Sequence, residues 1–136
     1  MITITIPGEL RGKGRPRFSA RGGFARAFTD AKTVNAEAWV RQCAAQVHAG
    51  APLDGPLSVQ LAVAVAIPAS WSKRKRADAI AGAIWPTGKP DLDNQLKLVG
   101  DALNGIVWAD DKQIVRAEVT RRYAEQPQAV LTVTEV

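Results

Sequence analysis

The side chains best suited to chemistry lie in one acidic stretch in the second half of the chain. Asp91 and Asp93 are separated by a single residue, and Lys97 follows one helical turn later. Asp110 and Asp111 then form a second acidic pair. Carboxylate oxygens favour Mg²⁺ or Mn²⁺, and such an ion can lower the pKa of an attacking water and stabilise charge on a leaving phosphate oxygen. The stretch therefore predicts metal-assisted hydrolysis of phosphodiester bonds.

A helix from about residue 94 to residue 104 is expected to position these side chains. Lys97 lies four residues after Asp93 and four before Asp101, on one polar face of that helix. We expect Asp101 to form a local ion pair on this face, which leaves it outside the site. The opposite, buried face is predicted from apolar residues at helical spacing, namely Leu92, Leu96, Val99 and Leu103.

The Asp-x-Asp spacing constrains where this helix begins. Within a helix, residues i and i+2 point in different directions, whereas an extended segment places them on the same side. Pro90 favours an extended entry, and aspartate is a common N-cap residue. We therefore expect Asp91 in the extended entry and Asp93 at or near the cap, so that both carboxylates can reach one metal ion.

A simpler interpretation gives the same residues only local roles. Asp93 would cap the helix, and Lys97 would be a surface lysine paired along it. Asp110 and Asp111 would belong to a polar turn. The combination of two acids, a lysine and two further acids around one short helix favours the metal site instead. In that site Lys97 would stabilise the pentacovalent phosphorane or orient the attacking water.

Composition places these residues in a single basic domain. The chain has 136 residues, 46% of them hydrophobic, and a formal net charge of +5, which suggests a polyanionic partner. The one cysteine, Cys43, excludes an intramolecular disulfide and fits a cytoplasmic location, while the one histidine, His48, excludes a Cys/His zinc site. The sequence has no membrane-length apolar run, signal peptide or phosphate-binding loop, so neither a membrane partner nor an organic cofactor is expected.

Two groups of cations are candidates for contact with nucleic acid. Residues 11–26 contain six cations and no acid, and their glycines and prolines predict an irregular loop that follows a phosphate backbone. Residues 73–76 place four cations in the first turn of a short helix, where the helix dipole disfavours them, which favours a role with a partner. The candidate nucleic-acid-binding residues are Arg11, Lys13, Arg15, Arg17, Lys73, Arg74, Lys75 and Arg76.

The remaining segments predict an α+β fold, a single compact domain with a mixed β-sheet of about four strands packed with helices. The strand at 57–67 alternates strictly, and its even-numbered residues are small enough for helices to pack on that side too. The first helix would bury Ala36, Val40, Cys43 and Val47. The elements follow the order β-α-β-α-α-β-β, with strands near 2–6, 57–67, 114–123 and 130–135 and helices near 30–49, 73–84 and 94–104.

Three short motifs make up the acidic stretch. Lys-Pro-Asp-Leu-Asp-Asn-x-x-Lys begins at Lys89, Asp-Ala-Leu-Asn-Gly at Asp101, and Trp-x-Asp-Asp-x-Gln-Ile-Val at Trp108. Together they resemble the RusA family of Holliday junction resolvases, and Gly-Lys-Gly-Arg-Pro-Arg at residues 12–17 is similar too. The resemblance is looser elsewhere. Gln95 stands where family members often carry an apolar residue.

The resemblance implies one RusA-like endonuclease domain over residues 1–136, acting as a homodimer and often encoded by a prophage. It implies that Asp91, Asp93 and Asp111 bind Mg²⁺, with Mn²⁺ as a substitute, and that Lys97 assists catalysis. Asp110 matches the acidic neighbour of the last ligand. The two active sites would nick opposed strands of four-way junction DNA symmetrically during recombination and repair, while the basic stretches hold the junction arms.

The residues alone leave one alternative of a different class. The chain could be a non-catalytic protein that binds junction or duplex DNA, with its acids serving as helix cap and turn. A Mg²⁺ requirement for cutting, lost in Asp93→Asn while binding is kept, would separate the enzyme from the binder.

Overall fold

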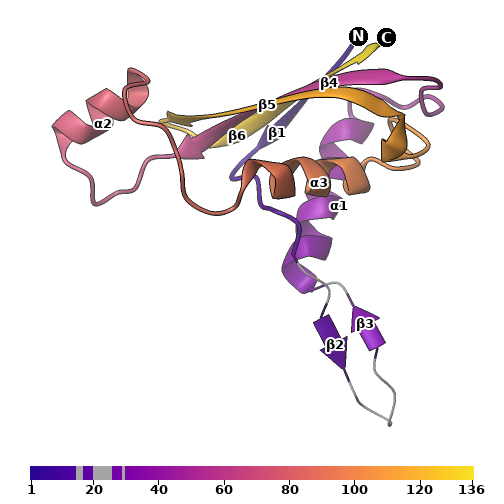
Figure 1. Ribbon diagram of the computed structural model, residues 1–136, viewed down its shortest axis with the longest axis horizontal. Coiled ribbons are helices and arrows are strands. Elements are labelled where there is room, and N and C mark those ends of the chain that lie inside the picture. The colour runs from indigo at the N-terminus through magenta and orange to yellow at the C-terminus, as the bar shows by residue number, and fades with distance from the viewer. Residues whose placement is uncertain (15–16, 20–25, 29) are drawn as a thin grey trace.

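A four-stranded sheet carries two helices on one face, and a third helix extends beyond its end (Figure 1). The computed structural model describes the backbone of residues 1–14, 17–19, 26–28 and 30–136, and the side chains of residues 1–14 and 30–136. Its elements are β1 (Ile2–Pro7), β2 (Arg17–Ser19), β3 (Arg26–Phe28), α1 (Ala31–Ala45), β4 (Leu57–Ala66), α2 (Lys73–Ile80), α3 (Leu92–Ala102), the 3₁₀ turn η2 (Asp111–Gln113), β5 (Ile114–Ala124) and β6 (Gln128–Glu135).

The main sheet has the strand order β1-β6-β4-β5. β6 pairs antiparallel with β1 and β4, whereas β4 and β5 are parallel, so the connection between them contains both α2 and α3. This arrangement confirms the predicted α+β class, the mixed four-stranded sheet and the order of the elements.

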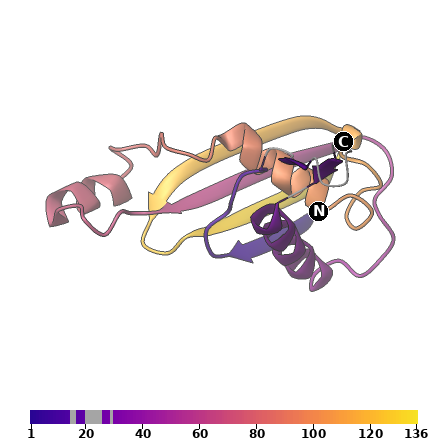
Figure 2. The same ribbon diagram turned by 90° about the horizontal axis from the view of Figure 1, so that it is seen from below.

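The core lies between the sheet and the two helices α1 and α3, which cover the same face (Figures 1 and 2). The alternation of β4 is confirmed: Leu57, Val59 and Leu61 are buried beneath the helices, while Gln60 and Ala62 are exposed on the other side. The prediction that helices also cover that second face is wrong for the described part of the chain. Small residues in β4 permit a second helix layer but do not supply one.

α1 begins where the sequence predicts and ends earlier. Asp30 is the N-cap, and its side chain accepts a hydrogen bond of 2.7 Å from the Thr33 amide. The helix stops at Ala45, four residues before the predicted end, because the chain then turns. Val47 is 55% exposed rather than buried, whereas Cys43 lies in the core as expected.

α3 starts two residues before the predicted position, and its buried face is wider than predicted. Asp91 takes the N-cap position, with extended φ and ψ of −68° and 154°. Leu92 is therefore in the first turn and 46% exposed, so its predicted burial is wrong. Val99 and Leu103 are buried as predicted, and Leu96 packs against the core in part. The structure adds further buried residues to this face, namely Gln95, Leu98, Gly100 and Ala102.

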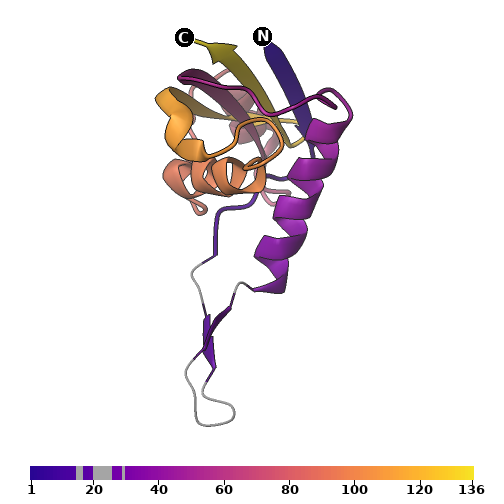
Figure 3. The same ribbon diagram turned by 90° about the vertical axis from the view of Figure 1, so that its right-hand side faces the viewer.

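The basic stretch near the N-terminus contains a short hairpin rather than only irregular loop. β2 and β3 pair antiparallel, with Arg17 opposite Phe28, and the hairpin extends away from the sheet beyond the start of α1 (Figure 3). The candidate Arg15 lies outside the described residues, and so does the side chain of Arg17. Among the described residues, no helix combines the length and apolar character needed to cross a membrane.

Candidate active site

The N-terminal end of α3 presents two acidic side chains that the fold hardly uses. Asp91 makes no side-chain capping bond to the helix backbone, and its contact with Asn94 Nδ2 is 3.5 Å long. Asp93 lies in the first helical turn and is exposed, so the cap is Asp91 and not Asp93 as the simpler interpretation held. Both side chains lie at the N-terminal end of α3, where the helix backbone presents its unpaired amide groups.

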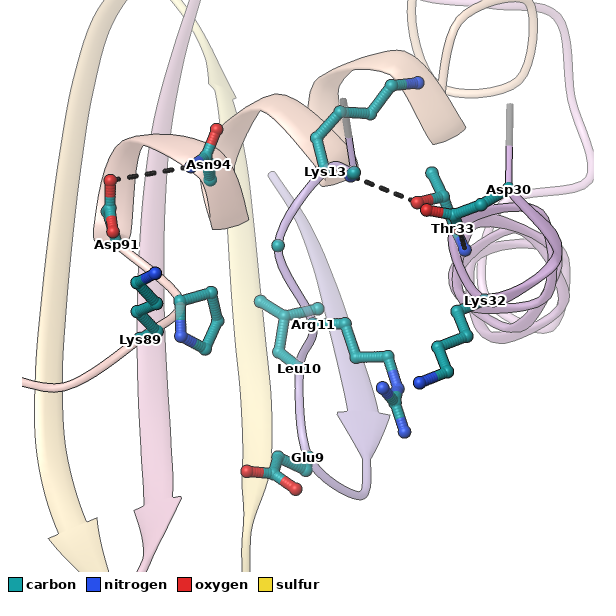
Figure 4. A pocket seen from close by; sticks show the side chains of 13 residues that line it. Glu9, Leu10, Arg11, Lys13, Asp30, Lys32, Thr33, Lys89, Asp91 and Asn94 are labelled. Atoms are coloured by element: carbon teal, nitrogen blue, oxygen red, sulfur yellow. Dashed lines mark hydrogen bonds between the residues drawn. The ribbon is translucent and has the colours of Figure 1, made fainter. Parts of the chain in front are cut away.

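A groove of about 750 Å³ opens beside Asp91, between the segment after β1 and the first turns of α1 and α3 (Figure 4). Its cations come from three segments and are Arg11, Lys13, Lys32 and Lys89, while the acids Glu9 and Asp30 also line it. Figure 4 shows Arg11 and Lys32 extending toward one another, while Lys89 lies next to Asp91. A groove with cations from three segments that reaches Asp91 can hold a phosphodiester strand by its backbone and deliver one phosphate to the acids at the start of α3.

Backbone contacts hold this groove open. The Lys13 amide donates to the Asn94 carbonyl at 3.0 Å, and the Gly14 amide donates to Thr33 Oγ1 at 3.0 Å. Gly12 allows the approach to α3, because a Cβ atom there would lie 2.7 Å from the Cβ of Pro90. One segment is thus fixed to both helices and forms the floor between them.

The turn beyond the C-terminal end of α3 is held by its own side chains. Asp110 is the N-cap of η2, and its carboxylate accepts a hydrogen bond of 2.9 Å from the Lys112 amide. Gln113 accepts from the Ala109 amide at 2.9 Å and donates to the Leu53 carbonyl at 2.8 Å. Asp110 therefore has the local role that the simpler interpretation gave it.

Asp111 is the first residue of η2, and its side chain lies against α3. A Cβ atom at Gly100 would be 3.4 Å from Asp111 Oδ2, so the glycine leaves room for the carboxylate against the helix. Burial raises the pKa of Asp111, and hydrogen bonding to Asp110 with the charges of Asp101 and Asp110 raises it further. The Lys112 amide lowers the pKa of Asp110. Asp110 therefore loses its proton at lower pH than Asp111.

Asp101 pairs with a distant residue and not with the lysine in its own helix. The Lys13 ammonium lies 3.1 Å from Asp101 Oδ2 and also contacts the largely buried carboxylate of Glu37. Burial acts to lower the pKa of Lys13, but its hydrogen bonds to Glu37 and Asp101 outweigh burial and raise it. Lys97 is exposed and forms no ion pair with any residue that the structure describes.

The predicted metal ligands therefore form two groups at opposite ends of α3. Gly100, beside Asp111, follows Asp91 by nine residues, or about 13 Å along a helix axis. Two oxygens that share one Mg²⁺ lie within about 4 Å of each other, because each binds at about 2 Å. Within the described ranges, no three His, Cys, Asp or Glu residues are grouped so as to hold a metal ion. In a single chain Asp91 and Asp93 share the N-terminal end of α3, and Asp111 lies toward the other end.

The four cations of α2 divide into two kinds. Lys75 lies 4.0 Å from the centre of the Trp71 ring, and Arg76 donates to the Pro68 carbonyl at 3.3 Å. Both side chains therefore also hold α2 to the segment that precedes it. Lys73 and Arg74 are exposed and have no such contact within the part of the chain that the structure describes.

Sequence reasoning missed three contributors to the groove. Lys32 and Lys89 supply two of its cations, and the only sequence signal was their position beside the two helix starts. Gln95 is 2% exposed, and its Nε2 donates to the Leu10 carbonyl at 2.9 Å, which ties the groove floor to α3. A polar residue on the buried face of a helix was the available signal for this contact.

Comparison with known proteins gives two findings. A family model described as "Endodeoxyribonuclease RusA" matches residues 7–134. A protein of Bacillus subtilis (strain 168), described as "Uncharacterized protein YqaN", is 36% identical over 137 residues, which cover 99% of this chain and 96% of that protein. The similarity thus extends over the sheet, all three helices and both acidic groups.

Proposed function

The chain belongs to the RusA family of endodeoxyribonucleases, which resolve Holliday junctions, and from this premise we propose a Mg²⁺-dependent enzyme. It would nick opposed strands of four-way junction DNA symmetrically, in the cytoplasm, during recombination and repair. The observation that carries the proposal is the groove, whose cations lead to the exposed carboxylate of Asp91, two residues before the exposed Asp93.

The side chains available for a metal fit Mg²⁺, with Mn²⁺ as a substitute, because all of them are carboxylates. We propose that Asp91 and Asp93 hold the ion together with Asp111. Within the described residues neither Asp91 nor Asp93 forms an ion pair, so both are free to bind a cation. When bound, Mg²⁺ would lower the pKa of the attacking water and offset charge on the phosphate.

A homodimer would resolve the separation of the acids. In one chain Asp111 lies about 13 Å along α3 from Asp91. In a two-fold dimer, the turn η2 of one copy would meet the start of α3 in the other and complete two equivalent sites. Two sites related by such an axis would also face two opposed strands of a junction, which would make the two nicks symmetric.

The DNA strand would run along the groove and be held by its phosphates. Arg11, Lys32 and Lys89 would contact successive phosphates, with further cations from the β2–β3 hairpin and from α2. Lys97, one helical turn after Asp93 and exposed, would stabilise charge on the phosphate under attack or orient the water. Lys13 is engaged by two acids, so its proposed role is to position the groove floor.

Cleavage of a synthetic immobile four-way junction, beside a linear duplex of the same sequences, tests the reaction. Paired nicks in the junction alone, dependent on Mg²⁺, are expected for the wild type. Asp93→Asn should lose at least about a hundredfold in rate while keeping junction affinity. Asp54→Asn, an exposed acid away from the groove, is the matched control. Tight junction binding without cutting in Mg²⁺ or Mn²⁺ would contradict the enzyme and favour a non-catalytic DNA-binding protein.

Mixing two inactive variants tests the shared site. Asp93→Asn and Asp111→Asn should each be inactive alone. If each site takes residues from two copies, their mixture forms heterodimers that contain one intact site, and single-strand nicking returns. If each site is built within one chain, those heterodimers contain no intact site and the mixture stays inactive.

A salt titration tests the groove. Replacing Lys32 or Lys89 by Ala should weaken junction binding and reduce the slope of log affinity against log salt by about one each. Arg116→Ala, an exposed cation of β5 that does not line the groove, is the control, and its slope should stay that of the wild type. Unchanged slopes for Lys32 and Lys89 would remove the groove as the path of the DNA strand.

A further inference from the structure

The segment between β4 and α3 forms an arm that reaches past the end of the sheet (Figures 1 and 2). Part of its aromatic surface holds the arm in place. The rings of Trp71 and Tyr123 meet edge to face, with centroids 5.1 Å apart, and Lys75 covers Trp71. These contacts hold the N-terminal end of α2 against β5. The position of the arm relative to the sheet is therefore fixed.

Trp85 is the aromatic residue of the arm that the fold leaves open. Its side chain is 52% exposed, although the next residue, Pro86, is buried and anchors the loop. The Arg122 guanidinium lies 4.4 Å from the centre of the Trp85 ring. Gly82, at φ +85°, makes room for it, because a Cβ atom there would lie 3.2 Å from Arg122 Nη1. Arg122 thus supports the ring at the surface.

The charge around this ring favours a nucleic acid over a protein surface. Arg122 borders the ring, and the exposed cations Lys73 and Arg74 belong to the same arm. An exposed aromatic ring beside a guanidinium, on an arm that carries further exposed cations, can stack on a nucleobase while the cations contact phosphates.

We propose that Trp85, supported by Arg122, stacks on an unpaired nucleobase of the DNA strand that approaches the groove. The inference rests on the proposed junction substrate, because bases inside a continuous duplex stack on each other and a branch point can release one. Asp91 lies six positions after Trp85, so the Cα atoms of the two residues are at most about 20 Å apart. The contacted base is therefore within about six nucleotides of the phosphate at the acids.

A double-mutant cycle between the ring and the base tests this contact. Junction affinity is measured without Mg²⁺ for the wild type and Trp85→Ala, on an intact junction and on junctions with abasic sites at the nucleotides flanking the branch point. Trp85→Ala should bind the intact junction about tenfold more weakly, the size of one stacked base. On the abasic junction the two proteins should bind equally, because the ring then has no base to contact.

Two further variants separate stacking from a structural effect. Trp85→Phe keeps a ring and should retain most of the affinity. Ile80→Ala removes an apolar side chain that is 49% exposed on the same arm, and should bind like the wild type. Equal losses for Trp85→Ala on intact and abasic junctions, or no loss at all, would overturn the inference and leave the ring to a protein partner.

The cycle also distinguishes this inference from the proposed function. A wild type that cuts junctions but shows no coupling between Trp85 and the bases would retain the function and refute the stacking. The wild type could instead bind junction and duplex DNA equally, while Trp85→Ala weakens binding only where the base is present. That result would retain the stacking and refute the junction substrate. Absence of any DNA binding would refute both.

Discussion

The two ends of α3 both carry acidic residues, yet the fold uses them differently. At the N-terminal end, Asp91 has one contact of 3.5 Å with Asn94, and Asp93 is exposed. At the C-terminal end, Trp108 is fully buried and donates from Nε1 to Asn104 Oδ1 at 3.1 Å, while Asp110 caps the next turn. The acids at the N-terminal end are exposed with few contacts, whereas the segment after the C-terminal end is anchored in the core by Trp108.

This difference separates residues that the fold requires from residues that it merely presents. Acids that cap or pair contribute to stability, so their presence is explained without any ligand. Asp91 and Asp93 have no such explanation, which makes them the best candidates for a metal. Asp111 is intermediate, because it packs against Gly100 yet belongs to the same motif as the capping residue.

The largest contrast between the two ends is expected in stability. Trp108→Ala should reduce the free energy of unfolding by about 3–5 kcal/mol, since it empties a fully buried site and removes two hydrogen bonds. Leu92→Ala, at the N-terminal end, should change it by about 0.5 kcal/mol or less, because Leu92 is 46% exposed. Urea unfolding of both variants measures the difference, and equal losses would mean that the N-terminal turn is packed as tightly as the core.

Disrupting the ion-pair network between α1 and α3 should cause the second-largest loss of stability. Glu37 is 9% exposed and pairs with Lys13 and Arg41. Glu37→Gln should cost about 2–3 kcal/mol, because it leaves two cations with one fewer carboxylate in a largely buried setting. Glu125→Gln, an exposed acid after β5, is the control for loss of charge alone. If the two variants unfold at the same urea concentration, the network contributes nothing and α1 is held by apolar contacts.

Two glutamines provide a matched comparison of smaller size. Gln113 makes four hydrogen bonds in the C-terminal turn, to the amides of Ala109 and Asp110 and the carbonyls of Leu53 and Gly55. Within the described part of the chain, Gln95 makes one, to the Leu10 carbonyl, and its buried Oε1 has no partner there. Replacing each by Leu should cost about 2 kcal/mol for Gln113 and about 1 kcal/mol or less for Gln95. The reverse order in thermal or urea unfolding would show that the groove floor depends on Gln95 more than the turn depends on Gln113.

Local patterns predicted the elements well, because strand alternation and helix caps depend on neighbouring residues. The buried side of β4, the extended backbone at Asp91 and the core position of Cys43 all followed from such patterns. The same pattern predicted the burial of Val99 and Leu103 in α3 but not the full width of that face, which depends on what packs against the helix. Gln95 is buried by contact with Leu10, a residue 85 positions away.

The parts of the site that could not be predicted depend on distant contacts. Lys13 pairs with Asp101, 88 positions later, whereas helical spacing favoured Lys97 as the partner. The groove exists because three separate segments meet, and no single one of them shows it. The hairpin of β2 and β3 was missed because glycine and proline nearby outweigh two strands of three residues each.

The smallest expected effect tests which acid of the C-terminal pair holds the proton. The pKa of Asp111 is raised above its ordinary 3.8, mainly by burial, so the native state binds more protons than the unfolded state in the window above 3.8. Stability is therefore lost as pH rises through that window. Asp111→Asn should be more stable than the wild type at pH 7, by a few tenths of a kcal/mol because solvent screens the site, and this gain should vanish below pH 3.8.

Asp110→Asn should change the stability in the opposite direction, so each of the two variants serves as the control for the other. The pKa of Asp110 is lowered, mainly by the Lys112 amide, so its ionised form stabilises the fold above pH 3.8 and that contribution is lost as pH falls. Asparagine still caps, so the substitution removes charge alone. Asp110→Asn should therefore be less stable than the wild type at neutral pH, by urea unfolding across the pH range. If both variants change stability in the same direction, the proton is not held by Asp111, and Asp111 would be as ready to bind a cation as the acids at the N-terminal end of α3.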